Sequence, residues 1–372
     1  MTGIRIKKIL YMGCYKNSIH RNIIFLKGLR KNNVEVYEYN VVTHNISKNL
    51  LLFLKNFKRL KNQNFDLILF HSEAFIQFIL VKILSSIKRV LLVHDIHISK
   101  LQTIYDDRKQ LKKRGLPKFL LRIILFAMDL IECSFSDYLI LDTNSHIKFF
   151  HDKFSVPIKK FRRVMVGGQD DIFFPLEKKH SSKEKIIVGF CGTYIPLQGV
   201  KYIIQSAKIL ENDKQIEFHL IGKGQTYEKD RSLANELNLK NIKFIDFIPI
   251  EEIPRFHKEF DIGLGIFGNT SKTLQVIPTK IFDGMAMKTP MITSDTPAIR
   301  ELFEENNNIV LCEPANPESL SKAILKLKND EKLRATIREN AYSLYKKKCS
   351  IDAIGKSLKK TLSNILKNEN RQ

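Results

Sequence analysis

The sequence predicts an α/β protein made of two doubly wound domains, each with a parallel sheet and crossover helices. Its 372 residues exceed the roughly 250–300 that a single hydrophobic core usually serves. Its composition, 44% hydrophobic and 27% charged, is that of a globular chain. Apolar runs of strand length also alternate with amphipathic runs of helix length. We therefore expect two sheets, each with ligands beyond the carboxyl ends of its strands.

The first half contains five apolar runs of strand length, separated by stretches that are typical of helices. The strand-like runs are 9–13, 34–40, 66–72, 89–95 and 138–143. The stretch 21–33 is typical of a helix between the first two runs. Parallel strands need long crossover connections, so this alternation predicts one parallel sheet within a first domain of residues 1–170.

The pattern restarts in the second half. The strand-like runs there are 186–192, 218–224, 242–247, 261–267, 291–295 and 308–313, and helical patterns include 200–213 and 232–240. Between the halves, residues 165–185 contain Gly167, Gly168 and Pro175 before a charged, serine-containing stretch, which is typical of a domain boundary. We expect a second domain over residues 171–345.

The net charge of +23 is unevenly distributed. Residues 1–170 hold 30 Lys+Arg and 13 Asp+Glu (30 − 13 = +17), and the remainder of the 62 and 39 leaves +6 for residues 171–372. The five cysteines are scattered and form no CxxC, which argues against a disulfide framework or a zinc site and fits a reducing cytoplasm. No signal peptide is expected, and charges interrupt the apolar runs 74–87 and 116–132, so we expect no membrane span.

Two basic segments of the first half, 48–63 and 108–126, mix Lys and Arg with Leu, Phe and Ile. This composition suits an anionic membrane surface, although an ordinary amphipathic helix with a solvated lysine-rich face would look the same. The pI of 9.7 would also suit a nucleic-acid-binding protein. The sequence contains no recognisable motif that reads nucleic acid, so we expect no nucleic-acid partner.

Residues 275–295 predict a loop, a short helix, a turn and the end of a strand, with Asp283 the one carboxylate on the helix. Such a unit places a helix N-terminus beside a ligand site, where anions bind. Asp283 would be a binding residue there, or else an ordinary solvated helix residue. Glycines at 13, 192, 199, 222 and 224 follow or end predicted strands, where backbone can approach a phosphate or simply turn tightly.

Several of these segments together resemble the GT4 family of retaining glycosyltransferases, which have the GT-B fold. The similar segments are 188–210, 219–224, 261–268 and 276–302, joined in the first half by 90–99, 137–150 and 160–175. The densest similarity is 261–301. The resemblance implies two Rossmann-like domains facing across a cleft, an acceptor-binding first domain and a nucleotide-sugar-binding second domain. It also implies that a C-terminal helix, residues 346–372, packs back on the first domain.

The resemblance also implies a donor site. In the family two carboxylates, eight residues apart, hold the sugar and the ribose; Asp283 matches the second, whereas the first position is Gln275. Two cations that usually lie over the diphosphate are replaced by Thr193 and Gln198. The leaving diphosphate still needs its charge stabilised. The remaining donor-site candidates are Gly192, Gly222, Lys272, Thr279 and Lys280. Lys272 is equally well explained as a solvated loop cation.

On the acceptor side, His94 and Asp95 end the strand-like run 89–95. Polar groups at that end of a strand are expected to point into the cleft. By resemblance, His94 would orient the transferred sugar and Asp95 would position or deprotonate the acceptor hydroxyl; a packed His and a capping Asp are the alternative. Gly13 is expected in an acceptor-side loop. His97 and the pair 107–108 are weaker candidates.

The resemblance implies a retaining hexosyltransferase-type glycosyltransferase that moves a sugar from a nucleotide-sugar donor to a glycan or lipid-linked acceptor. Cell-surface polysaccharide or glycolipid synthesis would be its setting, in the cytoplasm or on the inner face of the membrane. No cofactor or metal is expected, since the nucleotide sugar is a substrate and no Asp-x-Asp motif occurs. The alternatives are a catalytically weak GT-B scaffold subunit, a nucleotide-sugar 2-epimerase and a basic nucleic-acid-binding protein.

Overall fold

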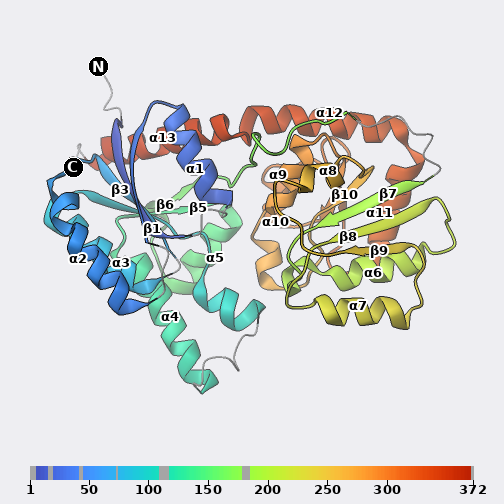
Figure 1. The fold of residues 1–372 in the computed structure, drawn as a ribbon, viewed down its shortest axis with the longest axis horizontal. Coiled ribbons are helices and arrows are strands. Elements are labelled where there is room, and N and C mark those ends of the chain that lie inside the picture. The colour runs from blue at the N-terminus through green and yellow to red at the C-terminus, as the bar shows by residue number, and fades with distance from the viewer. Residues whose placement is uncertain are drawn as a thin grey trace. The chain divides into compact units, whose positions relative to one another are not determined.

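The chain folds as two compact units, an N-terminal unit of Met1–Val166 with Ile351–Gln372 and a C-terminal unit of Gly167–Ser350. The computed structural model describes residues 6–15, 20–41, 45–72, 74–108, 117–177 and 185–369. The observed divisions follow Val166 and Ser350, whereas the sequence analysis places them after residues 170 and 345. Figure 1 labels the elements of both units.

The N-terminal unit contains a six-stranded, wholly parallel sheet in the order β2-β1-β3-β4-β5-β6. Its strands are β1 (Lys8–Cys14), β2 (Glu35–Asn40), β3 (Leu67–Ser72), β4 (Leu91–Asp95), β5 (Tyr138–Leu141) and β6 (Phe161–Arg163). In the central register, Leu10 of β1 lies opposite Ile68 of β3, which in turn lies opposite Leu92 of β4. All three are fully buried, so these strands read as continuous apolar runs.

Helices cover both faces of this sheet. They are α1 (His20–Lys31), α2 (Ile46–Asn62), α3 (Phe75–Lys88), η1 (Leu101–Asp107), α4 (Lys118–Phe135), α5 (Asn144–Phe154), η3 (Ile158–Lys160) and α13 (Ile351–Glu369). Alternate residues of β1 face opposite ways. Ile9 and Tyr11 pack with residues of α1 and α13. Leu10 and Met12 pack with residues of α2 and α3.

The last helix, α13, completes the core of the N-terminal unit by packing along α1 (Figure 1). The two helices approach closely where both carry glycine. A Cβ atom added to Gly355 would lie 2.2 Å from the carbonyl oxygen of Gly28, and one added to Gly28 would lie 2.7 Å from the carbonyl oxygen of Ile351. Larger residues would therefore push the helices apart.

The C-terminal unit contains a second six-stranded parallel sheet, in the order β12-β11-β10-β7-β8-β9. Its strands are β7 (Ile186–Cys191), β8 (Ile216–Ile221), β9 (Ile242–Ile245), β10 (Ile262–Leu264), β11 (Met291–Ser294) and β12 (Val310–Cys312). Chain order runs outward from β7 to β9 and then from β10 to β12. The connections therefore change direction between β7 and β10, where a doubly wound sheet binds its ligand.

Helices of the C-terminal unit follow the strands as crossovers. They are η4 (Pro196–Gln198), α6 (Val200–Ile209), α7 (Tyr227–Glu236), α8 (Ile253–His257), η5 (Ser271–Leu274), α9 (Thr279–Ala286), α10 (Pro297–Arg300), α11 (Pro317–Asn329) and α12 (Glu331–Lys348). A large core joins β7 and β8 to α6 and α11, with Phe190 and Phe218 at its centre. Within the described parts of both units, no helix is long and apolar enough to cross a membrane.

Candidate functional site

Two loops of the C-terminal unit lie side by side at the point where its strand order reverses. One follows β7 and contains η4; the other follows β10. Backbone hydrogen bonds join them, because the amide of Phe267 donates to the carbonyl of Gln198 (3.0 Å) and the amide of Gly268 donates to the carbonyl of Leu197 (3.2 Å). Gly199, directly after η4, packs closely against the second loop. Its φ is +66°, and a Cβ atom there would lie 2.5 Å from the amide nitrogen of Gly268.

A third loop, after β8, packs on the first residue beyond β7. Gly222 has a φ of +123°, and a Cβ there would lie 2.2 Å from the carbonyl oxygen of Gly192. The amide of Gly192 donates to the carbonyl of Ile221 at 3.0 Å. Both predicted glycines thus meet at one place, and Gly222 is fixed there by conformation and by space.

The Lys280 side chain, from the first turn of α9, reaches this same place. Its Nζ donates to Oε1 of Gln198 at 2.7 Å and lies 3.5 Å from the ring centroid of Phe190. A Cβ atom on Gly192 would come within 2.5 Å of that Nζ. The structure therefore brings together Gly192 and Gln198 of the loop after β7 and Lys280 of α9.

Lys280 and Asp283 are two ionisable groups buried on one helix. Burial lowers the pKa of Lys280 to about 7, although Cys191 and Asp283 act in the opposite direction. Burial raises the pKa of Asp283 well above its ordinary value, partly offset by Lys280. Oδ1 of Asp283 is buried without a hydrogen-bond partner. A ligand with both an anionic group and hydroxyl groups would stabilise the ammonium and satisfy the carboxylate.

The other predicted donor residues lie on the loops and helix that frame this group. Thr193 is exposed, directly after Gly192. Lys272 and Gln275 are buried, in and just after η5, which contacts η4. Thr279 is the half-buried first residue of α9, whose first turn carries no acidic residue. The amide of Ile281 donates to the carbonyl of Pro278 at 3.0 Å, and the start of the helix carries partial positive charge with no acidic residue in its first turn.

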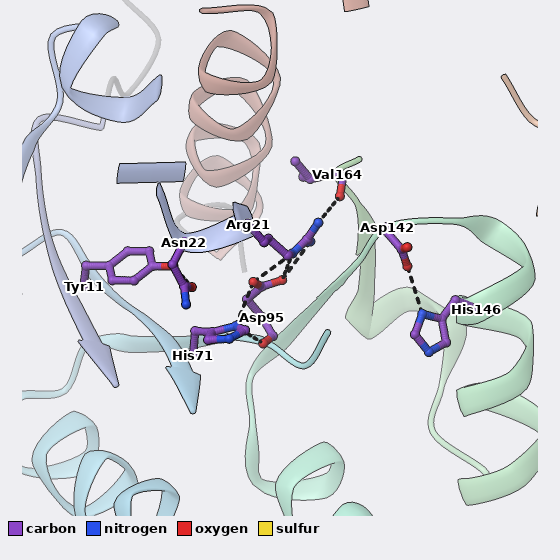
Figure 2. Close-up of polar contacts among 8 residues, drawn as sticks. All are labelled: Tyr11, Arg21, Asn22, His71, Asp95, Asp142, His146 and Val164. Carbon is purple, nitrogen blue, oxygen red and sulfur yellow. Dashed lines mark hydrogen bonds and ion pairs between the residues drawn. The ribbon is translucent and has the colours of Figure 1, made fainter. Parts of the chain in front are cut away.

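In the N-terminal unit, Asp95 lies at the centre of a buried network (Figure 2). Its carboxylate accepts two hydrogen bonds from Nε of Arg21, both at 2.9 Å, and lies 2.8 Å from a terminal nitrogen of the same guanidinium. Nδ1 of His71 lies 3.0 Å from Oδ2 of Asp95. Arg21 also donates to the carbonyl of Val164 at 3.1 Å. The network ties α1 to β3, β4 and the segment after β6.

These contacts make Asp95 a poor proton acceptor. Burial alone would raise its pKa, but Arg21 and His71 hold the pKa below its usual range. The side chain is fully buried. The expectation that the polar end of β4 points away from the core was therefore wrong for this residue, because the partner groups are inside the unit. Asp95 is placed to position Arg21 and His71.

His94 is also interior, on the opposite side of β4 from Asp95. Its ring lies 4.9 Å from that of Phe70 and stacks on Phe78 at 5.7 Å. Burial, followed by Lys100, lowers its pKa well below 6.5, so it is neutral at ordinary pH. The expectation that His94 points into a cleft was wrong, and the packed-histidine alternative describes its surroundings.

The weaker candidate His97 is the histidine that lies beyond the end of β4. Its side chain is half-buried, and its ring lies 6.2 Å from that of His71. Burial and then Arg21 lower its pKa to about 3. Asp107 and Arg108 lie at the end of η1. Gly13 lies within β1 and not in a loop, and a Cβ there would clash with the carbonyl oxygen of His71 at 1.8 Å.

Sequence reasoning missed other polar residues of the N-terminal unit. His71 is the last residue but one of β3. Asp142 follows β5, and its Oδ1 lies 2.8 Å from Nδ1 of His146 (Figure 2). The rule that selected His94, a polar residue at a strand's carboxyl end, would also have found His71 and Asp142. Nothing in the sequence marks Arg21, which occupies an ordinary position in a helical pattern.

Across the residues whose positions are known, no cluster of three or more His, Cys, Asp or Glu side chains could hold a metal ion.

The sequence is related to glycosyltransferases. Residues 173–344 match the family described as glycosyl transferases group 1. An uncharacterized glycosyltransferase of Methanocaldococcus jannaschii is 28% identical over 158 residues, 42% of each chain. Alpha-D-kanosaminyltransferase of Streptomyces kanamyceticus is 23% identical over 185 residues, 49% of this chain and 47% of the relative. These two matches therefore span less than half of each relative.

Longer matches agree with them. A second uncharacterized glycosyltransferase of Methanocaldococcus jannaschii is 22% identical over 355 residues, 91% of this chain and 86% of the relative. An Anabaena protein solved in complex with UDP and glucose has a TM-score of 0.69 at 16% identity, covering 96% of this chain and 100% of its own. Sucrose-phosphate synthase from Thermosynechococcus elongatus has a TM-score of 0.73 at 13% identity, covering 96% and 99%.

The two six-stranded parallel sheets match the GT-B fold of those glycosyltransferase structures. The match of residues 173–344 contains the loops and the helix that bring Lys280 to Gly192 and Gln198. The family match over residues 173–344, the glycosyltransferase relatives and the fold together show what this chain is similar to: the glycosyl transferases group 1 family in its second half, and glycosyltransferases of the GT-B fold over most of its length.

Proposed function

We propose that this chain is a glycosyltransferase that transfers a sugar from a nucleotide diphosphate donor to a glycan or lipid-linked acceptor, with retention of configuration and without a metal. The observation that carries the proposal is the meeting of Lys280, Gln198 and Gly192 where the strand order reverses, with unpartnered Asp283 one turn further along the same helix. Solved neighbours of the fold hold UDP and glucose or UDP-glucose, which is consistent with such a donor.

Lys280 would supply the charge that the sequence lacks at residues 193 and 198. Its Nζ donates to Gln198, so Lys280 would place a cation beside one of the two positions from another segment of the chain. The donor diphosphate would bind between this ammonium and the amides at the start of α9. Asp283 would accept hydrogen bonds from the ribose hydroxyls. The absence of side chains at Gly192 and Gly222 would let the diphosphate approach the backbone.

The chemical step would follow from that placement. As the nucleoside diphosphate leaves, negative charge grows on its oxygens and Lys280 with the α9 amides would stabilise it. The sugar becomes oxocarbenium-like, and Gln275 would orient its hydroxyls without adding charge. Lys272, Thr193 and Thr279 would complete the polar lining of the donor site. The acceptor would attack on the face that the diphosphate leaves, which gives retention.

In the N-terminal unit, we propose His97 and not His94 as the histidine that contacts substrate. His97 lies beyond the end of β4, whereas His94 is packed between phenylalanines. The low pKa of His97 keeps its imidazole neutral, so its ring can accept a hydrogen bond from a hydroxyl group. Asp95, Arg21 and His71 would fix the local backbone and would not exchange protons with substrate.

A donor screen tests the proposal. The full chain is incubated with a panel of nucleotide sugars, and released nucleoside diphosphate is measured for the native chain and for Asp283→Ala. Loss of charged hydrogen bonds to the ribose should weaken donor binding by about 10- to 100-fold in the variant. Binding without turnover would instead favour a scaffold subunit. That alternative is supported by Gln275, Thr193 and Gln198, which replace a carboxylate and two cations of the family. A changed nucleotide sugar without any acceptor would favour a 2-epimerase.

The lowered pKa of Lys280 gives a second, independent test. At pH 8 a group with a pKa of about 7 is mostly neutral, and a bound diphosphate would raise that pKa because it favours the charged ammonium. Diphosphate binding at pH 8 should therefore take up close to one proton, and affinity should fall as the pH rises above about 7. Calorimetry in two buffers of different ionisation enthalpy measures the uptake. Lys280→Gln should abolish it; unchanged uptake in this variant would contradict the assignment.

Cell-surface polysaccharide or glycolipid synthesis is the setting that we propose for this activity. Two named relatives support this proposal: one is an amylovoran biosynthesis glycosyltransferase of Erwinia amylovora and the other is a poly(ribitol-phosphate) alpha-N-acetylglucosaminyltransferase of Staphylococcus aureus. These relatives are 26% and 24% identical to this chain. A lipid-linked acceptor would bring the enzyme to the inner face of a membrane.

A further inference from the structure

Three consecutive helices of the N-terminal unit, α2, α3 and α4, expose an unusual number of large apolar side chains. Twelve of the seventeen large apolar residues that are exposed in the described parts of the chain lie on them. Leu54 of α2 is 59% exposed, and Phe119 and Ile123 of α4 are 67% and 57% exposed. Each helix buries its opposite side in the core, so these residues form a second apolar surface that no described element covers.

The three helices lie on the same face of their sheet. Residues of α2 and α3 pack against Leu10, Met12 and Ile68 in one core cluster. α3 contacts both α2 and α4. Along the chain α2 follows β2, α3 follows β3, and α4 follows η1, which comes after β4. Figure 1 labels the three helices. We call their exposed side the α2–α4 face.

The helices of this face expose cations and no acids; Asp137, which follows α4 and is about one-third exposed, pairs with Lys82 of α3 at 3.4 Å. The three helices hold seven lysines and two arginines, of which α2 alone carries Lys48, Lys55, Lys58, Arg59 and Lys61. Their acidic residues are Asp129 and Glu132, and both are fully buried. Asp129 accepts hydrogen bonds from Oγ of Ser99 (2.6 Å) and from the amide of Lys100 (3.0 Å), and Glu132 pairs with Lys100.

Other exposed helices of the chain differ from this pattern. In the C-terminal unit, α12 carries Glu331 and Glu339 among its cations, and Glu339 pairs with Lys288 at 2.7 Å. The exposed apolar residues of that unit are isolated, as Phe247 is, at 73% exposure after β9. A general excess of lysine in the sequence therefore does not explain the α2–α4 face, whose three helices combine exposed apolar residues and cations and expose no acids of their own.

We propose that the α2–α4 face docks the N-terminal unit on a lipid bilayer that contains anionic headgroups. Its apolar side chains would enter the boundary between headgroups and acyl chains, and its cations would lie at the level of the headgroups. Lysine stems allow this arrangement, because the charged end can reach the headgroups while the methylenes cover apolar surface. A protein partner fits less well, since the cores of protein interfaces are depleted in lysine.

This inference goes beyond the proposed transfer reaction and does not depend on it. Vesicle binding needs neither donor nor acceptor, so it can succeed or fail independently of the donor screen. If vesicle binding and sugar transfer are both observed, the α2–α4 face is the side of the N-terminal unit that contacts the membrane during transfer to a lipid-linked acceptor.

Vesicle sedimentation tests the proposal with the full chain. Vesicles of phosphatidylcholine alone are compared with vesicles that contain phosphatidylglycerol, and binding should be at least about tenfold tighter to the anionic ones. The triple variant Leu54→Ser, Phe119→Ser and Ile123→Ser should lose most of this binding. Phe247→Ser, which removes an exposed apolar side chain from the C-terminal unit, is the matched control and should bind as the native chain does.

A charge-reversal pair separates electrostatic from apolar docking. Lys55→Glu with Lys58→Glu should weaken binding to anionic vesicles by about tenfold or more, given roughly fivefold for each cation at such a surface. Lys322→Glu on exposed α11 should change it much less. An unfolding transition of the N-terminal unit that stays near its native temperature without vesicles would show, for every variant of this face, that the unit remains folded.

Three results would overturn the inference. They are absence of binding to both vesicle types, equal losses in the face variants and their controls, and a dimer in light scattering that the triple variant dissolves without vesicles. The last result would mean that a second copy of the chain covers the α2–α4 face.

Discussion

Single residues decide how the candidate donor site handles charge. Asp283 and Lys280 were found in the sequence, but their protonation is set by tertiary burial, which raises the pKa of the carboxyl group and lowers that of the amine. The sequence could place both on one short helix. It could not show that Oδ1 of Asp283 lacks a partner or that Lys280 contacts Gln198, because those facts depend on a loop 82 residues away.

We expect Asp283→Asn to stabilise the unliganded chain while it weakens nucleotide binding. The raised pKa means that Asp283 stabilises the fold most below its ordinary pKa of 3.8, and that this contribution is lost as the pH rises through the folded-state pKa. An uncharged amide avoids the cost of burying a carboxylate, about 1–3 kcal/mol at neutral pH. Thermal unfolding from pH 4 to pH 8 should show a smaller decline for the variant.

Asp295→Asn is the control of opposite sign. Arg300 lowers the pKa of Asp295, so removing this exposed carboxylate should not raise the stability. If Asp283→Asn unfolds at a lower temperature than the native chain at pH 8, Asp283 is ionised and paired in the fold, and the assignment of a buried, unpartnered carboxylate fails.

The histidines show the limit of reasoning from position along a strand. The polar residues at the carboxyl end of β4 were expected to point out of the core. His94 and Asp95 are consecutive residues of a strand, so their side chains point to opposite faces of the sheet. Both faces of this sheet are covered by helices, so both directions lead inward. His97 lies beyond the last residue of β4, so its side chain is not directed into either covered face.

At the scale of elements, apolar runs predicted the longer strands well. The run 66–72 corresponds to Leu67–Ser72, and 186–192 corresponds to Ile186–Cys191. The three-residue strand Phe161–Arg163 was not predicted, because two of its residues are arginines and it pairs only at an edge of the sheet. The π-helix Leu101–Asp107 was also missed, since its hydrogen-bond pattern has no period in the sequence.

The buried pair of Arg21 and Asp95 should couple α1 to the sheet strongly. Arg21→Met leaves Asp95 buried and without its cation, which should cost about 3–5 kcal/mol of unfolding free energy. Asp95→Leu should be similarly costly, but the double variant should cost less than the sum because no lone charge remains. Urea denaturation of the full cycle measures the coupling.

Arg30 gives the matched control for this cycle. It lies on the same helix and pairs with Glu38 at 3.0 Å, but it is half-exposed, so Arg30→Met should cost less than about 1 kcal/mol. The native pair should also weaken in acid: the lowered pKa means that the contribution of Asp95 is present above pH 3.8 and is lost below it. Additive effects in the cycle would show that the network does not tie α1 to the sheet.

At the scale of the whole molecule, alternation of strands and helices predicted two parallel sheets, because helical crossovers leave few other topologies. The strand orders were not predictable from it, since they depend on which edge each crossover reaches. The return of the chain to the N-terminal unit was expected from family resemblance. The exact place of that return, after Ser350, depends on packing between Gly28 and Gly355 that a sequence pattern does not reveal.

This organisation predicts that the two units respond differently to loss of α13. Truncation after Ser350 removes Ile354, Leu358, Leu362 and Ile365, which are fully buried in the core of the N-terminal unit and each contribute on the order of 2 kcal/mol. The C-terminal unit keeps Gly192, Gln198, Lys280 and Asp283 and loses no part of its own core. Calorimetry should therefore show a lowered or missing transition for the N-terminal unit and a second transition whose temperature nucleoside diphosphate still raises.

Truncation after residue 367 keeps the four buried residues and should leave both transitions near their native temperatures. If the truncation after Ser350 abolished the diphosphate effect while the C-terminal unit remained folded, the donor site would need residues of the N-terminal unit. Its assignment to Gly167–Ser350 alone would then be wrong.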